Sequence, residues 1–251
     1  MTWQQYQWLV LAWMAAGLGT FLYLLRVNAP FGRHIRSGWG PTVDNRLAWM
    51  VMEGTVLVSL TLSWAAGPKP ATLPLTVVAG LFYAHYMHRS LIFPWFLRTS
   101  GKRMPLAVML SAVGFNIVNG FLLGYFFSHF ANYPPGWLQD SRFLFGLGLF
   151  VLGAGINIFS DYHLIRLRQP GETGYKLPHG GWFRFVSCPN HFGEILEWTG
   201  FAILSWCLPG AAFAFWTFAN LAPRAWAHHR WYLERFETYP PGRKALLPFI
   251  W

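Results

Sequence analysis

The chain has 251 residues, of which 54% are hydrophobic, 19% aromatic and only 11% charged, and its net charge is +10. So few charges cannot cover a soluble domain, so many aromatics exclude a disordered chain, and two cysteines exclude a disulfide scaffold. The basic residues lie in short gaps between long apolar stretches, which excludes a nucleic-acid-binding protein and indicates an integral membrane protein.

Apolar stretches follow one another along most of the chain, and about 20 such residues suffice for one membrane crossing. In chain order the first five predicted spans are 7–25, 47–66, 73–97, 104–127 and a shorter one at 143–158. A further stretch, 195–221, is long for one crossing and contains Pro209 near its middle. It is either one long span or two short ones.

The basic residues in the gaps decide between these two possibilities. The first gap is rich and holds Arg26, Arg33, Arg36 and Arg46, whereas the second and fourth gaps hold only Lys69 and Arg142. Since cytoplasmic loops carry the excess of Lys and Arg, the rich gaps are expected in the cytoplasm. The gap before 195–221 and the tail after it are both rich, so the stretch must cross twice.

These counts predict an all-α integral membrane protein, a seven-transmembrane helical bundle with its N-terminus outside and its C-terminus cytoplasmic. The sixth and seventh spans turn near Pro209, and the seventh runs past Arg224 because it is otherwise too short. No soluble domain is recognisable, so residues 1–251 are expected to form a single membrane domain.

Glu53 is the clearest functional candidate, because a charged group at mid-bilayer costs about 2.5–3.5 kcal/mol on insertion scales. It lies roughly 9 Å inside the second span, and Tyr86 lies roughly 16 Å inside the third, so the two are expected at a similar depth. Burial favours the neutral, proton-donating form of a carboxyl group. An interhelical hydrogen bond is the alternative for Glu53, and packing alone would explain Tyr86.

Other polar residues in the spans have more ordinary explanations. His85 and Arg89 share a helix face, where they would line a polar cavity or neutralise Glu53. Asn116 and Asn119 in the fourth span predict hydrogen bonds between helices.

Three helical faces in the second half carry polar groups where a bundle should be apolar. Their members, three or four residues apart, are Asn157 and Asp161; Asn190, Glu194 and Glu197; and Arg224, His228 and Tyr232. Arg168, Tyr175 and Lys176 lie in a glycine-rich loop between two of them. Cations and aromatic rings beside such a loop suit a phosphate-bearing cofactor, whereas solvated contacts with lipid headgroups are the alternative.

Two other motifs do not carry chemistry. Gly146 and Gly153 lie with two further glycines inside an apolar span, where they predict close helix packing and no dinucleotide-binding turn. His228, His229 and Glu234 do not predict a metal site, because adjacent histidines point to different helix faces.

Several long motifs resemble the steroid 5α-reductase (3-oxo-5-alpha-steroid 4-dehydrogenase) family. They are the runs 157–198 and 224–251, the HYMHR segment at 85–89, and Glu53 within its span. The resemblance implies a seven-span, NADPH-dependent reductase that converts 3-keto-Δ4-steroids to 5α-products by reducing the carbon 4–5 double bond. The partners it implies are such a steroid or a related enone lipid and the bilayer, with no metal.

The resemblance also implies roles for individual residues. Glu53 and Tyr86 would polarise the 3-keto oxygen while carbon 5 receives a hydride. Residues 1–130 would form the steroid side, and 143–251 the NADPH side. The implied NADPH contacts are Arg103, Asn157, Asp161, Arg168, Tyr175, Lys176, Asn190, Glu194, Arg224, His228 and Tyr232. The sequence departs from the family pattern at Met52, Lys176 and Ala227.

Two other functions remain open at this point. A membrane methyltransferase of the isoprenylcysteine or phospholipid type would use S-adenosylmethionine, and the NH-x-x-E run at 190–194 would suit one. A non-catalytic sterol-binding bundle would leave the three polar faces without a purpose. Cofactor binding separates these possibilities, and the expected location is the bacterial inner membrane or the endoplasmic reticulum.

Overall fold

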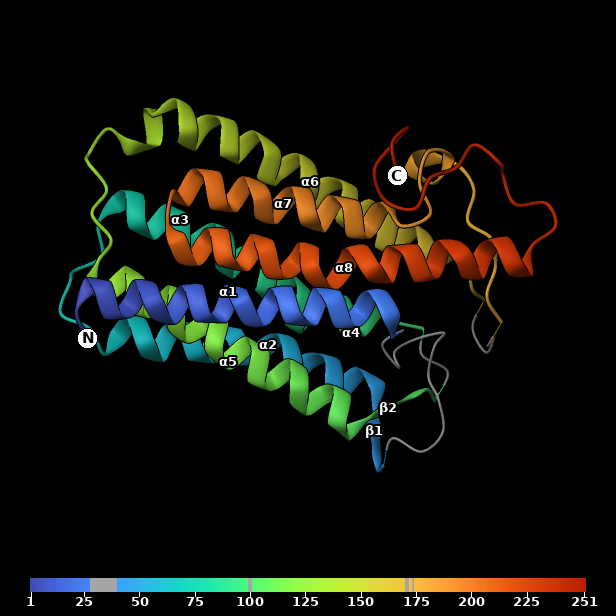
Figure 1. Ribbon diagram of the computed structural model, residues 1–251, viewed down its shortest axis with the longest axis horizontal. Helices are drawn as coiled ribbons and strands as arrows, with labels where there is room; N and C mark the ends of the chain where they lie inside the picture. The colour runs from blue at the N-terminus through green and yellow to red at the C-terminus, as the bar shows by residue number, and fades with distance from the viewer. Residues whose placement is uncertain (28–39, 99–100, 170–171, 173) are drawn as a thin grey trace.

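A computed structural model describes residues 1–27, 40–98, 101–169, 172 and 174–251 as a long helical bundle (Figure 1). Arg33 and Arg36 of the first rich gap lie outside the described residues. The α-helices are α1 (Trp3–Arg26), α2 (Asn45–Ala65), α3 (Leu73–Met87), α4 (Phe93–Phe96), α5 (Leu106–His129), α6 (Ser141–Arg166), α7 (Pro189–Ser205) and α8 (Leu208–Arg235).

Every predicted span corresponds to helical structure. The third is composite, because a π-helical turn, His88–Ile92, joins α3 to α4. The stretch 195–221 is divided as predicted: α7 ends at Ser205, Trp206 adopts a left-handed conformation with φ 42°, and α8 begins at Leu208. The α7 helix, which is the sixth predicted span, starts at Pro189, six residues before the predicted start at 195. Its first turn is polar, and a search for apolar runs therefore does not find it.

Four of the helices, α1, α2, α5 and α6, are long and apolar enough to cross a membrane. The α3 and α7 helices are shorter, with 15 and 17 residues, and the 28-residue α8 becomes polar in its second half. Successive spans run in alternating directions, so the α2–α3 connection, which holds Lys69, and the start of α6, which holds Arg142, lie at one end of the bundle (Figure 1). The structure is therefore that of a multi-pass membrane protein.

A short β-ribbon is an exception to the all-α prediction. β1 (Thr42–Asp44) pairs antiparallel with β2 (Arg103–Pro105), and Val43 lies opposite Met104. The predicted start of the fourth span at 104 was therefore two residues early, because 103–105 belong to this ribbon and α5 begins at Leu106.

Acidic caps define where two of the helices begin. The Asp44 carboxylate accepts hydrogen bonds from the first backbone N–H groups of α2, at 2.9 and 3.0 Å. Asp140 caps α6 in the same way, and the side chain and backbone of Arg142 both donate to it. These hydrogen bonds lower the pKa of Asp140 to about 2.

The α6 and α7 helices approach so closely that glycines are required between them. A Cβ atom on Gly153 would lie 2.3 Å from the Glu197 nitrogen, and one on Gly146 would lie 2.5 Å from the Leu204 nitrogen. Gly193 and Gly200 on α7 meet the backbone of α6 equally closely. The predicted role of Gly146 and Gly153 in close packing is confirmed, and α6 with α7 forms a rigid pair.

Gly153→Ala is expected to destabilise the protein by about 1–3 kcal/mol, because the added methyl group must push the two backbones apart. Gly155→Ala is the matched control, since a Cβ at Gly155 meets no atom within 4 Å. Thermal unfolding in detergent should show a lower midpoint for the first variant alone. Equal midpoints for the two variants would contradict the rigid pair.

Candidate active site

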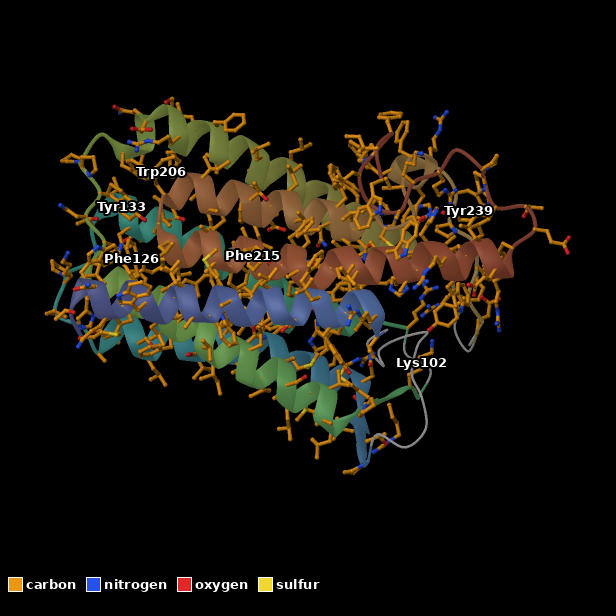
Figure 2. All side chains as sticks on the ribbon, viewed as in Figure 1. Lys102, Phe126, Tyr133, Trp206, Phe215 and Tyr239 are labelled. Carbon is orange, nitrogen blue, oxygen red and sulfur yellow. The ribbon has the colours of Figure 1, made fainter. Side chains whose placement is uncertain are left out.

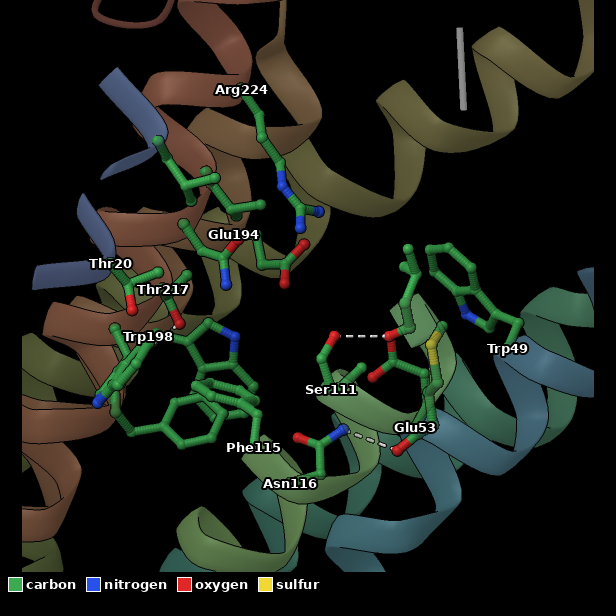
Figure 3. A pocket seen from close by; sticks show the side chains of 18 of the residues that line it. Thr20, Trp49, Glu53, Ser111, Phe115, Asn116, Glu194, Trp198, Thr217 and Arg224 are labelled. Atoms are coloured by element: carbon green, nitrogen blue, oxygen red, sulfur yellow. Dashed lines mark hydrogen bonds between the residues drawn. The ribbon is translucent and has the colours of Figure 1, made fainter. Parts of the chain in front are cut away.

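A cavity of about 570 Å³ opens between the helices, in the half of the bundle where α1 ends and α2 and α5 begin. This volume lies in the range of small-molecule binding sites. Its walls are formed mainly by α1, α2, α5, α7 and α8 (Figure 3). Most of the lining is apolar, and its large side chains are Trp13, Trp49, Met52, Phe115, Trp198, Phe213 and Trp216.

Glu53 and Tyr86 both line this cavity, as their predicted similar depth requires. Glu53 comes from α2, and Tyr86, which is 5% exposed, comes from the last turn of α3. Within the described residues, neither the Glu53 carboxyl nor the Tyr86 hydroxyl makes a hydrogen bond or an ion pair. The half-buried Glu53 carboxyl and the buried Tyr86 hydroxyl therefore face an apolar cavity without a partner among the described residues, an arrangement that suits a ligand oxygen atom.

The backbone around Tyr86 is irregular. The π-helical turn starts two residues later, and the Ser90 hydroxyl donates a 2.6 Å hydrogen bond to the Tyr86 carbonyl. The Tyr86 ring packs against Phe82 and Trp198, with centroids 4.9 and 5.6 Å apart. Such π-helical turns are frequent at functional sites.

Asn116 joins the α2 and α5 walls of the cavity. Its side-chain amide donates a 2.7 Å hydrogen bond to the carbonyl of Met52, the residue before Glu53 (Figure 3). Asn119, one turn later, accepts a 3.2 Å hydrogen bond from the indole of Trp13. The predicted interhelical role of both asparagines is confirmed.

Arg89 lies at the centre of a buried polar network beside the cavity. Its guanidinium donates a 2.6 Å hydrogen bond to Asp161 and lies 3.8 Å from the Glu194 carboxylate. Asp161 also accepts a 2.9 Å hydrogen bond from Asn190, and Asn157 donates at 3.0 Å to the Asn190 carbonyl. The α6 and α7 polar faces thus converge as predicted, and the partners of Arg89 are these acids.

His85 has a separate partner in the bundle interior. Its Nδ1 lies 2.7 Å from a carboxylate oxygen of Glu197, and both side chains are buried. Lining a polar cavity was one of two roles expected for His85, and His85 is absent from the lining of this cavity, with its ring packed against Tyr86 and Trp198.

The polar face of α8 only partly joins this site. Arg224 lines the cavity and points toward Glu194 (Figure 3). His228 lies farther along, with its ring 5.8 Å from that of His191. Tyr232 is buried in another apolar cluster with Leu177 and Tyr239.

The basic residues from the loops gather at the end of the bundle where Lys102 and Tyr239 lie (Figure 2). The cations of Arg168 and Lys102 flank the ring of Tyr175, 4.9 and 4.8 Å from its centroid. Two cations on one aromatic ring form a rim suited to phosphate groups. Lys102 was not among the predicted contacts, because a basic gap between spans indicates orientation and does not single out one residue as a ligand contact.

Two predicted contacts have other partners in this structure. Lys176 forms an exposed ion pair with Glu172 at 2.7 Å, which lowers the pKa of that carboxyl group. Arg103 donates two hydrogen bonds to Thr42 and thereby holds the β-ribbon. Neither arrangement brings these two side chains to the cavity lining.

Several small polar side chains of the lining were missed from the sequence. They are Thr20, Ser111, Thr217 and Asn220. The buried Oδ1 of Asn220 accepts no hydrogen bond within the part of the chain that the structure describes. In the described part of the chain, no group of three or more His, Cys, Asp or Glu residues could hold a metal ion.

Comparison with known proteins gives consistent matches. Residues 102–251 match the sequence model of the family described as 3-oxo-5-alpha-steroid 4-dehydrogenase. The chain is 43% identical over 238 residues to 3-oxo-5-alpha-steroid 4-dehydrogenase 1 of Homo sapiens, covering 94% of this chain and 92% of the relative. It is 39% identical over 253 residues to a steroid 5-alpha-reductase of Arabidopsis thaliana, covering 98% and 97%.

Proposed function

Because the chain belongs to the steroid 5-alpha-reductase (3-oxo-5-alpha-steroid 4-dehydrogenase) family of oxidoreductases, we propose that it reduces the carbon 4–5 double bond of a 3-keto-Δ4-steroid with NADPH. The observation that carries this proposal is the pair Glu53 and Tyr86, whose side-chain oxygens face the cavity without protein partners. The product would have the 5α configuration. The methyltransferase and non-catalytic alternatives are set aside, since the family is one of reductases.

The two residues suit the chemistry of an enone. Its β-carbon accepts a hydride only when the carbonyl is polarised, because negative charge builds up on the oxygen atom. Two hydrogen-bond donors aimed at that oxygen stabilise the charge in a cavity that excludes water. Tyr86 donates a hydrogen bond from its hydroxyl group, and Glu53 donates one in its neutral form. The enolate left after hydride addition at carbon 5 then takes up a proton from water at carbon 4. The apolar aromatic walls hold the steroid rings.

The charges around the cavity support a neutral Glu53. The Glu197 carboxylate is already paired with His85, whose Nδ1 lies 2.7 Å away. Arg89 and Arg224 then balance Asp161 and Glu194, which lie beside them. The cations that act on Glu53 are Arg89 and His85, and each of them is already paired with another acid. A carboxyl group without an ion-pair partner in an apolar site is favoured in its protonated form.

The residues on the other side of the cavity fit NADPH. The buried amides of Asn157 and Asn190 and the Arg224 cation offer donors beside the cavity, and Arg168 and Lys102 offer cations at the rim. Such cations suit phosphate groups, including the 2′-phosphate that distinguishes NADPH. NADPH, when bound, supplies the hydride.

The predicted assignment of residues 1–130 to the steroid and of 143–251 to NADPH needs one refinement. The cavity wall includes Trp198, Phe213 and Trp216, which belong to the half assigned to NADPH. The proposal is therefore that both halves enclose the steroid, while residues 143–251 provide most cofactor contacts. Because the basic connections lie at one end of the bundle, we keep the predicted membrane orientation, in which the C-terminus is cytoplasmic and the N-terminus is outside.

The direct test uses the purified protein in detergent with NADPH and a 3-keto-Δ4-steroid such as progesterone. Steroid-dependent loss of NADPH absorbance, with a 5α-product identified by chromatography, is the expected result. NADPH binding without oxidation would reject these steroids as substrates. Binding of S-adenosylmethionine in place of NADPH would overturn the proposal.

Arg168→Ala is expected to raise the apparent KM for NADPH more than that for the steroid. The reason is that Arg168 stands at the rim, away from the cavity lining, and its charge suits a phosphate group. Arg235→Ala, at an exposed arginine farther along α8, is the control for a general loss of positive charge. An unchanged NADPH constant in the Arg168 variant would count against the cofactor assignment.

A further inference from the structure

The His85–Glu197 pair has no part in the proposed reaction. Both side chains are almost completely buried, with exposures of 6% and 2%, and neither lines the cavity. The second carboxylate oxygen of Glu197 is also buried and accepts no hydrogen bond from the described residues. Burying such a pair inside an apolar bundle is costly, and apolar residues would fill the space more cheaply.

Each member of the pair directly precedes an aromatic residue of the cavity wall. His85 is followed by Tyr86 on α3, and Glu197 is followed by Trp198 on α7. The His85 ring meets both of these aromatic rings edge-on, with centroids 5.0 Å from Tyr86 and 4.6 Å from Trp198. The pair therefore lies immediately behind the side chain proposed to polarise the substrate carbonyl.

The two ends of the pair differ in how firmly their helices are held. Glu197 belongs to the rigid α6–α7 pair, where Gly153 lies directly against its backbone. His85 belongs to the end of α3, where the regular helix gives way to the π-helical turn at 88–92. The 2.7 Å contact between His85 Nδ1 and Glu197 therefore fixes the irregular end of α3 to the α6–α7 pair.

Resting on the proposed function, we propose that His85 and Glu197 are positioning residues that hold the Tyr86 hydroxyl where the substrate carbonyl binds. They act through the backbone turn and ring contacts of Tyr86, without touching the substrate. Loss of the pair lets Tyr86 move while the cavity and the cofactor contacts remain. The expected consequence is a fall in kcat with little change in either KM.

The decisive test compares a single and a double variant. Glu197→Leu leaves His85 buried without a partner, which lowers both stability and kcat. The double variant His85→Leu with Glu197→Leu leaves no unpaired group, so the unfolding midpoint should recover. Because a misplacement of about 1 Å can cost roughly 10²-fold in rate, kcat of the double variant should stay low by about that factor.

Two further variants separate positioning from general stability. Glu197→Gln keeps an acceptor for the imidazole N–H and should retain most of the wild-type kcat. Tyr133→Phe removes a 2.6 Å hydrogen bond to Ser205 at the far end of α7 and should leave kcat unchanged. Recovery of kcat together with stability in the double variant would overturn the proposal, since the pair would then be merely structural.

A second readout does not depend on activity. Amide hydrogen exchange of the segment 82–92, followed by mass spectrometry, should be faster in the double variant than in wild type or Tyr133→Phe. Unchanged exchange there would reject the positioning role. An inactive wild type would instead contradict the proposed function, while the exchange experiment would still test the pair.

Discussion

Tyr86→Phe is expected to lower turnover of a 3-keto-Δ4-steroid by roughly 10²–10³-fold, the cost of one lost oxyanion donor. The substitution removes only the hydroxyl group, which makes no hydrogen bond to the described protein, so packing and folding should be preserved. The turnover of the Glu53→Gln variant is expected to fall by a similar factor, because an amide is a weaker hydrogen-bond donor than a carboxylic acid and cannot yield a proton. The measurement is steroid-dependent NADPH oxidation, with kcat and KM determined separately.

The same helix offers a matched control for the tyrosine. Tyr83 lies one turn before Tyr86, and its hydroxyl pairs with Thr61 at 2.6 Å, away from the cavity lining. Tyr83→Phe should therefore retain wild-type turnover. Near-normal turnover in both the Glu53 and Tyr86 variants would remove the pair from the chemistry and leave the cavity without its proposed carbonyl site.

The helices could be placed from the sequence because a membrane span requires a long local run of apolar residues. Apolar runs located the spans, and the alternating basic gaps showed that 195–221 folds as two helices, which α7 and α8 confirm. Spacing of three or four residues also predicted polar helix faces, and the structure brings Asn157, Asp161 and Asn190 of two such faces together. Periodicity identifies a helix face, and a polar face in a membrane bundle needs a polar partner.

Periodicity does not identify the partner itself, and this explains what was missed. Arg89 could neutralise any of several acids, and only the packing of the bundle places it beside Asp161 of α6 and Glu194 of α7. The π-helical turn after Tyr86 leaves no trace in an apolar sequence. Short polar side chains such as Thr217 and Asn220 are common in helices, so their position in the cavity wall emerges only from three-dimensional packing.

Arg89→Met is expected to have the largest effect on stability. Arg89 is 7% exposed and faces both Asp161 and Glu194, so its removal leaves the buried Asp161 without its cation and leaves Glu194 with Arg224 alone. Breaking a buried ion pair in this way costs about 3–5 kcal/mol. The unfolding midpoint in detergent should fall sharply, and NADPH affinity should fall with it because α6 and α7 lose their shared anchor.

A second arginine shows why burial, and not the ion pair itself, decides this outcome. Arg142 pairs with Asp140 at 2.8 Å, but its side chain is 42% exposed, and surface pairs contribute about 0–1 kcal/mol. Arg142→Met should thus unfold close to the wild-type midpoint. Adding Asp161→Asn and Glu194→Gln to Arg89→Met should recover part of the lost stability, because the unpaired charges are gone. If Arg89→Met were as stable as Arg142→Met, the buried network would not hold the π-helical turn at 88–92 against α6 and α7.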